Sequence, residues 1–240
     1  MSDSMISPPL SMSRQARRAG VRSPAGGWLP ALLLAALALT AVAPVKAADP
    51  AVVAASGGGG VAACASCHGA AGEGMASFPR LAGMNANYLY RQMEAIGDGS
   101  RNNPVMKPIV DALGVKGMRE MADYYATLPL PAAPREVPGA TSPGAGLALR
   151  GDWDRNIPGC VQCHGPRGTG VGDQFPAIAG QPAGYIVSQL KAWKDGSRKN
   201  DPLELMRHLS AQLSETEMRD VAAWFSGQSP KAAPASKESR

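Results

Sequence analysis

The five-residue pattern Cys-x-x-Cys-His occurs twice in this chain of 240 residues and uses all four of its cysteines. The copies are Cys64-Ala-Ser-Cys67-His68 and Cys160-Val-Gln-Cys163-His164. Two thiols at this spacing lie on one helical turn, where they can add to the two vinyl groups of one haem, and the next histidine can bind its iron. The pattern therefore predicts two covalent haem c groups, with thioethers from Cys64, Cys67, Cys160 and Cys163 and iron ligands from His68 and His164.

Two other kinds of site use paired cysteines. A redox-active dithiol is expected on a thioredoxin-like βαβ unit, which this sequence lacks. A zinc site built from both pairs is the second alternative, but it leaves the two adjoining histidines without a role. Haem attachment explains all three residues of each pattern.

The two halves of the chain resemble each other for roughly eighty residues around these patterns, which indicates an internal duplication. The matching segments include a Phe-Pro-x-x-Ala-Gly sequence, a Tyr and a Gln on the following segment, and an Asp-Gly-Ser-Arg turn. In the two copies these are Phe78–Gly83 and Phe175–Gly180, Tyr88 and Tyr185, Gln92 and Gln189, and 98–101 and 195–198.

Each copy is predicted to be helical, because apolar residues recur at helical spacing and no segment alternates like a strand. Ser214 and Glu217 form a capping box that predicts where the last helix begins. The apolar stripes are Leu89, Met93 and Ile96 with Ile186, Leu190 and Trp193, then Met118, Met121, Ala122 and Tyr125 with Met218, Val221, Ala222 and Phe225.

The sixth iron ligand distinguishes an electron carrier from a haem that binds small molecules. Methionine is the natural candidate, since the third histidine, His208, has no counterpart in the first copy and is expected to be a surface residue. Most methionines lie on the apolar stripes or do not recur. Met106 and Met206 recur in a Pro-containing loop between the two apolar helices, and we predict that they are the sixth ligands.

These features together resemble class I cytochromes c, and the tandem arrangement is similar to the dihaem cytochrome c-four family. The resemblance covers both copies, which make up nearly all of the chain after its first 47 residues. It implies an all-α fold of two tandem class I cytochrome c domains, each wrapped around one covalent haem. It also implies that the carbonyl groups of Pro79 and Pro176 accept hydrogen bonds from the iron-binding imidazoles. Such bonds orient the ring and raise its basicity.

One departure from this family concerns the start of the first copy. Class I modules open with an amphipathic helix, but a run of small residues, 56–60, stands just before Val61. The second copy retains a better helical segment at 146–150. We therefore expect the opening helix of the first copy to be short or frayed.

The predicted organisation begins with a signal peptide, because arginines precede an apolar run and Val45-Lys46-Ala47 offers small residues for cleavage. An uncleaved membrane anchor is the alternative. Prolines and glycines indicate a linker between the copies, and the polar end of the chain indicates a disordered tail. The predicted ranges are 1–47 for the signal, 48–129 for the first domain, 130–145 for the linker, 146–228 for the second domain and 229–240 for the tail.

The charge of the mature chain argues against nucleic-acid binding. The whole chain carries a formal charge of +5. Removal of residues 1–47 leaves 19 Lys and Arg against 18 Asp and Glu, a charge of +1. No basic, aromatic stripe remains in the mature chain.

The predicted function is one-electron transfer in the periplasm, between a cytochrome bc complex or a dehydrogenase and a terminal oxidase or reductase. Its expected partners are redox proteins bound transiently, including membrane-bound respiratory complexes, with no small-molecule substrate. A dedicated cytochrome subunit of a dehydrogenase or sulfur-oxidising enzyme is the first alternative, and a haem enzyme such as a peroxidase is the second. Arg101 and Arg198, at matching loop positions, are candidate partners of the haem propionates, or else solvated loop residues.

Overall fold

A computed structural model describes residues 49–132 and 138–230. The predicted signal peptide, residues 133–137 of the predicted linker and residues 231–240 of the predicted tail lie outside the described residues. Within the two described ranges the regular secondary structure is helical, as predicted, apart from one small hairpin. None of the helices in these ranges combines the length and the apolar character needed to cross a membrane.

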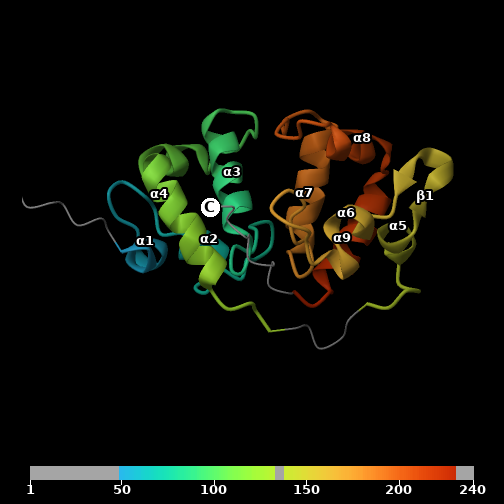
Figure 1. The fold of residues 1–240 in the computed structure, drawn as a ribbon, viewed down its shortest axis with the longest axis horizontal. Helices are drawn as coiled ribbons and strands as arrows, with labels where there is room; N and C mark the ends of the chain where they lie inside the picture. Colours follow the sequence, from blue (N-terminus) through green and yellow to red (C-terminus); the bar gives the residue numbers. More distant parts are fainter. Residues whose placement is uncertain (1–48, 133–137, 231–240) are drawn as a thin grey trace, which may run out of the picture. The chain divides into compact units, whose positions relative to one another are not determined.

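Residues 49–132 form the first copy, with helices α1 (Pro50–Ser56), α2 (Ala65–His68), α3 (Ala86–Gly97) and α4 (Lys107–Thr127). The Asn85 side chain caps α3 by accepting a hydrogen bond from the backbone N–H of Tyr88. Helices α3 and α4 pack side by side (Figure 1). Their apolar faces enclose the first core.

The second copy repeats this order and adds a hairpin. Its helices are α5 (Ala145–Leu149), α6 (Val161–His164), α7 (Ala183–Lys194), α8 (Leu205–Gln212) and α9 (Glu215–Ser226). Strands β1 (Gly151–Asp152) and β2 (Ile157–Pro158) pair antiparallel around the short 3-10 turn η1 (Trp153–Arg155), and a second such turn, η2 (Pro166–Gly168), follows α6. Helix α7 contacts both α8 and α9 (Figure 1).

Helix α4 of the first copy corresponds to α8 and α9 together. Gly114 interrupts α4 with a φ of 60° and a ψ of 178°, a conformation that favours glycine. In the second copy the chain breaks at Leu213, which is extended. Each copy therefore has two helical segments after the loop that carries the candidate methionine.

The opening helix of the first copy is short, as expected, but it is longer than the opening helix of the second copy. Helix α1 has seven residues, two more than α5 of the second copy. The side chain of Asp49 caps its start, and Gly57 ends it with a φ of 73°. The small residues that follow form a tight turn in which Gly58 pairs with Val61. The glycine run therefore follows the helix and does not replace it.

The apolar stripes predicted from the sequence form the two cores. Trp193 and Met93 are only half-buried. Met121, Ala122 and Tyr125 are at most 4% exposed in the first core, and Met218, Val221, Ala222 and Phe225 are at most 3% exposed in the second core.

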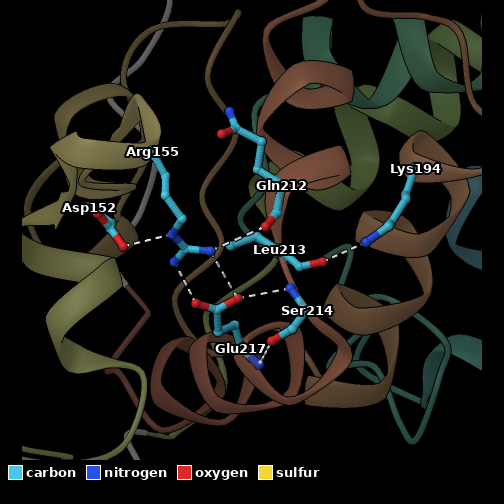
Figure 2. A network of polar contacts seen from close by, with 7 residues as sticks. All are labelled: Asp152, Arg155, Lys194, Gln212, Leu213, Ser214 and Glu217. Atoms are coloured by element: carbon cyan, nitrogen blue, oxygen red, sulfur yellow. Dashed lines mark hydrogen bonds and ion pairs between the residues drawn. The ribbon is translucent and has the colours of Figure 1, made fainter.

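A polar network fixes the hairpin of the second copy to α9 (Figure 2). The guanidinium of Arg155 donates to the carboxylates of Asp152 and Glu217 and to the carbonyl of Gln212. The predicted capping box is confirmed, since Ser214 Oγ accepts from the Glu217 N–H at 3.2 Å and Glu217 Oε2 accepts from the Ser214 N–H at 2.8 Å. Donation by Arg155 is the main reason why the pKa of Glu217 falls to about 2.

Candidate haem sites

Each Cys-x-x-Cys-His pattern forms one short helix. In α2, the backbone N–H of His68 donates to the carbonyl of Cys64 at 2.9 Å, which places all three functional side chains on one helical turn. Gly69 then turns the chain with a φ of 83°. A side chain at this position would collide with the Glu73 carboxylate. The second copy repeats the arrangement with Cys160, His164 and Gly165.

Both histidine rings are buried and oriented by a proline carbonyl. His68 Nδ1 lies 2.8 Å from Pro79 O, and His164 Nδ1 lies 2.8 Å from Pro176 O. An edge of Phe78 approaches the His68 ring, with centroids 6.3 Å apart. Because Nδ1 donates to the carbonyl, the lone pair of Nε2 is available to a metal.

Burial lowers the pKa of both histidines, and the hydrogen bonds to the prolines only partly oppose this effect. The rings are therefore neutral at pH 7, the state in which imidazole binds iron. This combination of neutral charge, fixed ring and free Nε2 fits a proximal haem ligand.

The cysteines do not have the properties of a dithiol redox centre or a zinc site. Burial raises the pKa of Cys160 to about 11 and also raises that of Cys64. A catalytic thiol requires the opposite shift. Across residues 49–132 and 138–230, no three His, Cys, Asp or Glu side chains gather as a metal cluster. The structure therefore brings the two cysteine pairs to two separate sites.

Met106 lies in the loop between the two apolar helices, as predicted, but Met206 is already part of a helix. Met106 is the residue immediately before α4, and Met206 lies in the first turn of α8. Both side chains are half-buried and pack against the core of their own copy. By contrast, Met118 and Met218 are buried in the cores, as expected for packing residues.

Arg101 and Arg198 lie where the two copies meet, and both are buried, with exposed fractions of 7% and 4%. They face each other in an antiparallel backbone bridge. Arg101 donates to Tyr185 Oη at 2.9 Å and to Gln189 Oε1 at 2.9 Å. Arg198 donates to the same Gln189 oxygen at 2.8 Å and to Gln92 Oε1 at 2.7 Å.

This arginine pair is strongly positive. Within the described residues no carboxylate forms an ion pair with either guanidinium. Burial alone raises the pKa of Tyr185, but the charges of Arg101 and Arg198 outweigh burial and lower it. A buried pair of cations with neutral partners is suited to bind carboxylates.

The repeated Asp-Gly-Ser-Arg turns position these two arginines. The carboxylate of Asp98 accepts a hydrogen bond from the backbone N–H of Ser100 at 2.8 Å, and Asp195 accepts from Ser197 at 2.8 Å. The sequence alone assigns no role to Gln92, Gln189 or Tyr185. Their recurrence at matching positions in both copies was the available signal.

The comparisons with known proteins agree with this geometry. The model of the cytochrome c family matches residues 58–127 and 157–228, one match in each copy. The thiosulfate dehydrogenase electron acceptor of Stutzerimonas stutzeri is 47% identical over 186 residues, which cover 75% of this chain and 86% of that protein.

The chain also resembles solved structures. Thiosulfate dehydrogenase (TsdBA) from Marichromatium purpuratum matches with a TM-score of 0.69 and 38% identity, covering 75% of this chain but 40% of that one. Reduced cytochrome c4 from Pseudomonas stutzeri matches with a TM-score of 0.63 and 30% identity, covering 69% of this chain and 93% of that one.

Proposed function

Since this chain belongs to the cytochrome c family, as a member with two haem domains, we propose that it accepts electrons from a thiosulfate dehydrogenase. The observation that carries this proposal is the 47% identity with a protein named as the electron acceptor of that enzyme. The chain has two covalent haem c groups, as predicted, and it is an electron-transfer protein rather than an enzyme. None of the relatives named above is a peroxidase, the enzymatic alternative that the sequence left open.

The residues of each copy fit the attachment of one haem c. Cys64 and Cys67 would hold the first through thioether bonds, and Cys160 and Cys163 the second. Each haem, when bound, takes up and releases one electron at its iron. His68 and His164 would bind the iron through Nε2, because their Nδ1 atoms already donate to Pro79 and Pro176.

Met106 and Met206 are proposed to close the sixth positions. A thioether stabilises the reduced iron relative to a second imidazole, which suits an electron acceptor. Met106 immediately precedes α4 and Met206 lies in the first turn of α8, so the backbone next to each methionine is held by a helix. Closed sites favour electron transfer over ligand binding.

Arg101 and Arg198 are proposed to bind haem propionates. The support is their burial next to each other without carboxylate partners among the described residues. Propionate binding would neutralise part of this charge.

The partners of this chain are redox proteins, and the identity of the donor is part of the proposal. In the Marichromatium purpuratum protein, a chain segment similar to this one belongs to a longer chain named thiosulfate dehydrogenase. A separate acceptor is expected to dock transiently on such an enzyme through a small interface. Two one-electron sites in one chain can store both electrons of a two-electron oxidation.

We propose that the protein is periplasmic, that its signal is cleaved after Ala47, and that a terminal oxidase or reductase accepts its electrons. The segment that carries this signal lies outside the described residues. N-terminal sequencing of the exported protein should begin at Ala48. A chain that retains residues 1–47 would support the membrane-anchored alternative.

Rapid mixing tests the proposed donor. Oxidised holoprotein, a purified thiosulfate dehydrogenase and thiosulfate should give reduced haem absorption within the turnover time of the enzyme. Omission of the dehydrogenase should abolish the reduction, since the chain is not itself an enzyme. Reduction by thiosulfate alone, or none with the complete mixture, contradicts the proposal.

A general respiratory carrier is the second candidate, supported by the similarity to cytochrome c4. A quinol-oxidising cytochrome bc complex would then be the donor. Parallel assays with both donors separate the candidates, because the faster donor at equal concentration identifies the physiological class.

A further inference from the structure

Arg80 is a buried cation that neither haem site requires for attachment. Its exposed fraction is 0%, and it lies between the two copies. Its Nη1 donates to the carbonyl of Ala82, and its Nη2 donates to the carbonyl of Ala179 at 3.2 Å. Its Nε has no acceptor in the part of the chain that the structure describes.

The two carbonyl groups occupy the same position in the two copies. Ala82 follows Pro79 by three residues, and Ala179 follows Pro176 by three residues. Each of these prolines accepts the hydrogen bond from the buried histidine of its copy. One guanidinium therefore contacts both histidine-orienting loops at equivalent points.

Only one of the two copies supplies such a charge. The residue that corresponds to Arg80 in the second copy is Ala177. Gln181 of the second copy fixes the Arg80 backbone, accepting from its N–H at 2.9 Å and donating to its carbonyl at 3.0 Å. The residue that corresponds to Gln181 in the first copy is Met84, which cannot make this pair of contacts.

The charge of Arg80 is not compensated. No ion pair to its guanidinium occurs within residues 49–132 and 138–230, and its hydrogen-bond partners are neutral carbonyls. Burial lowers its pKa to about 10, which still leaves the group protonated at neutral pH. A fixed charge in such a dry environment acts on nearby charges far more strongly than one at the surface.

We propose that Arg80 raises the reduction potentials of both haems together. Oxidised iron carries one more positive charge than reduced iron, so a buried cation near both sites disfavours the oxidised state of each. Because the guanidinium contacts equivalent points of both loops, the two potentials respond in parallel. This inference rests on the ligation by His68 and His164 proposed above, but it does not depend on the electron donor.

Redox titration of the holoprotein tests this role, with the potential of each haem followed separately by NMR of its methyl groups. In Arg80→Gln, the midpoint potentials of both haems should fall by the same amount. In Arg80→Lys, which keeps the positive charge, both midpoint potentials should stay close to those of the wild type. Arg91→Gln is the matched control. This variant also removes a cation that contacts the other copy, because Arg91 forms an ion pair with Asp173. The Arg91 side chain is 35% exposed, so the shift in the midpoint potentials should be much smaller.

A second control separates the effect of the Arg80 charge from the effect of the contact between the two copies. Gln181→Met introduces the residue found in the first copy. It removes the two hydrogen bonds to the Arg80 backbone but leaves the charge of Arg80 in place. The proposal is wrong if Gln181→Met lowers the two midpoint potentials as much as Arg80→Gln does. It is also wrong if Arg80→Gln changes the midpoint potential of only one haem or of neither. Retention of the low-spin six-coordinate absorption spectrum in every variant shows that the iron ligation is intact, so failure of the tuning role is distinguishable from failure of the ligation.

Discussion

The backbone N–H of Met206 donates a 2.6 Å hydrogen bond to the carboxylate of Asp201. The same carboxylate accepts from the N–H of Arg207 at 3.1 Å, so it caps the start of α8. In the first copy the N–H of Met106 donates to the Asn103 side chain at 3.0 Å. A polar side chain earlier in the loop therefore fixes the backbone of each candidate ligand.

Met106→Leu and Met206→Leu should each remove half of the far-red absorption band that methionine-bound oxidised haem displays. Leucine keeps the apolar volume but has no sulfur to bind iron. Met118→Leu is the control and should leave the band intact, because Met118 is buried in the core. A band that survives in either ligand variant would exclude that methionine.

Asp201→Ala should weaken the second site without removing its ligand. Loss of a helix cap costs about 1 kcal/mol. On heating, half of the far-red band should therefore disappear at a lower temperature than in the wild type. Asp201→Asn retains an oxygen acceptor and should behave nearly as the wild type does. Equal behaviour of all three proteins would contradict the positioning role.

Arg198→Gln should lower the midpoint potential of one haem more than that of the other, because it removes one cation of the buried arginine pair. Lys199→Gln removes the same charge from an exposed neighbour and should have little effect. Redox titration of both variants provides the measurement. Unchanged potentials in Arg198→Gln would rule out the propionate role.

Glu217→Gln should destabilise the protein at neutral pH by about 1 kcal/mol, after allowance for solvent screening of this partly exposed pair. Glutamine can still complete the capping box with Ser214, so the loss reports on the charge. The pKa of Glu217 in the folded protein is about 2, below the ordinary value of 4.5. Its contribution is therefore complete above about pH 5 and is lost as the pH falls toward 2.

Denaturant unfolding of both proteins between pH 7 and pH 2 measures this difference. The two unfolding free energies should converge as the pH falls. A difference that stays constant over this range would show that Arg155 does not stabilise the charged form of Glu217.

Met218→Ala should reduce the free energy of unfolding by about 2–5 kcal/mol, since it opens a cavity in the second core. Met218 is 1% exposed. Leu203→Ala is the control, because Leu203 is 78% exposed and surface changes usually stay within about 0.5 kcal/mol. Denaturant titration of the holoprotein distinguishes the two outcomes.

The features that the sequence predicts well are local or repeated. Two cysteines and a histidine within one turn need only an α-helical backbone to come together. The stripe that contains Met218 and Phe225 has the period of a helix, so its burial follows from the pattern. The capping box of Ser214 and Glu217 depends on four consecutive residues.

The features that the sequence does not predict depend on how the two copies pack against each other. Arg101 has the sequence context of a solvent-exposed turn, yet Gln189 and Tyr185 of the other copy bury it. The contact between Arg80 and Gln181 joins residues that are 101 positions apart. Neither helical periodicity nor charge pattern carries this information. The sequence also does not reveal that the glycine run ends α1, because a run of glycines can either replace a helix or end one.

The contacts of Arg80 also limit how the two copies can be exchanged. A protein made of two first copies would bring two guanidinium groups to the space between the same two carbonyls, where their like charges would repel each other. Two second copies would place Ala177 on both sides and leave this space without a donor. The two halves of the duplicated chain are therefore complementary at this contact, where each supplies what the other lacks.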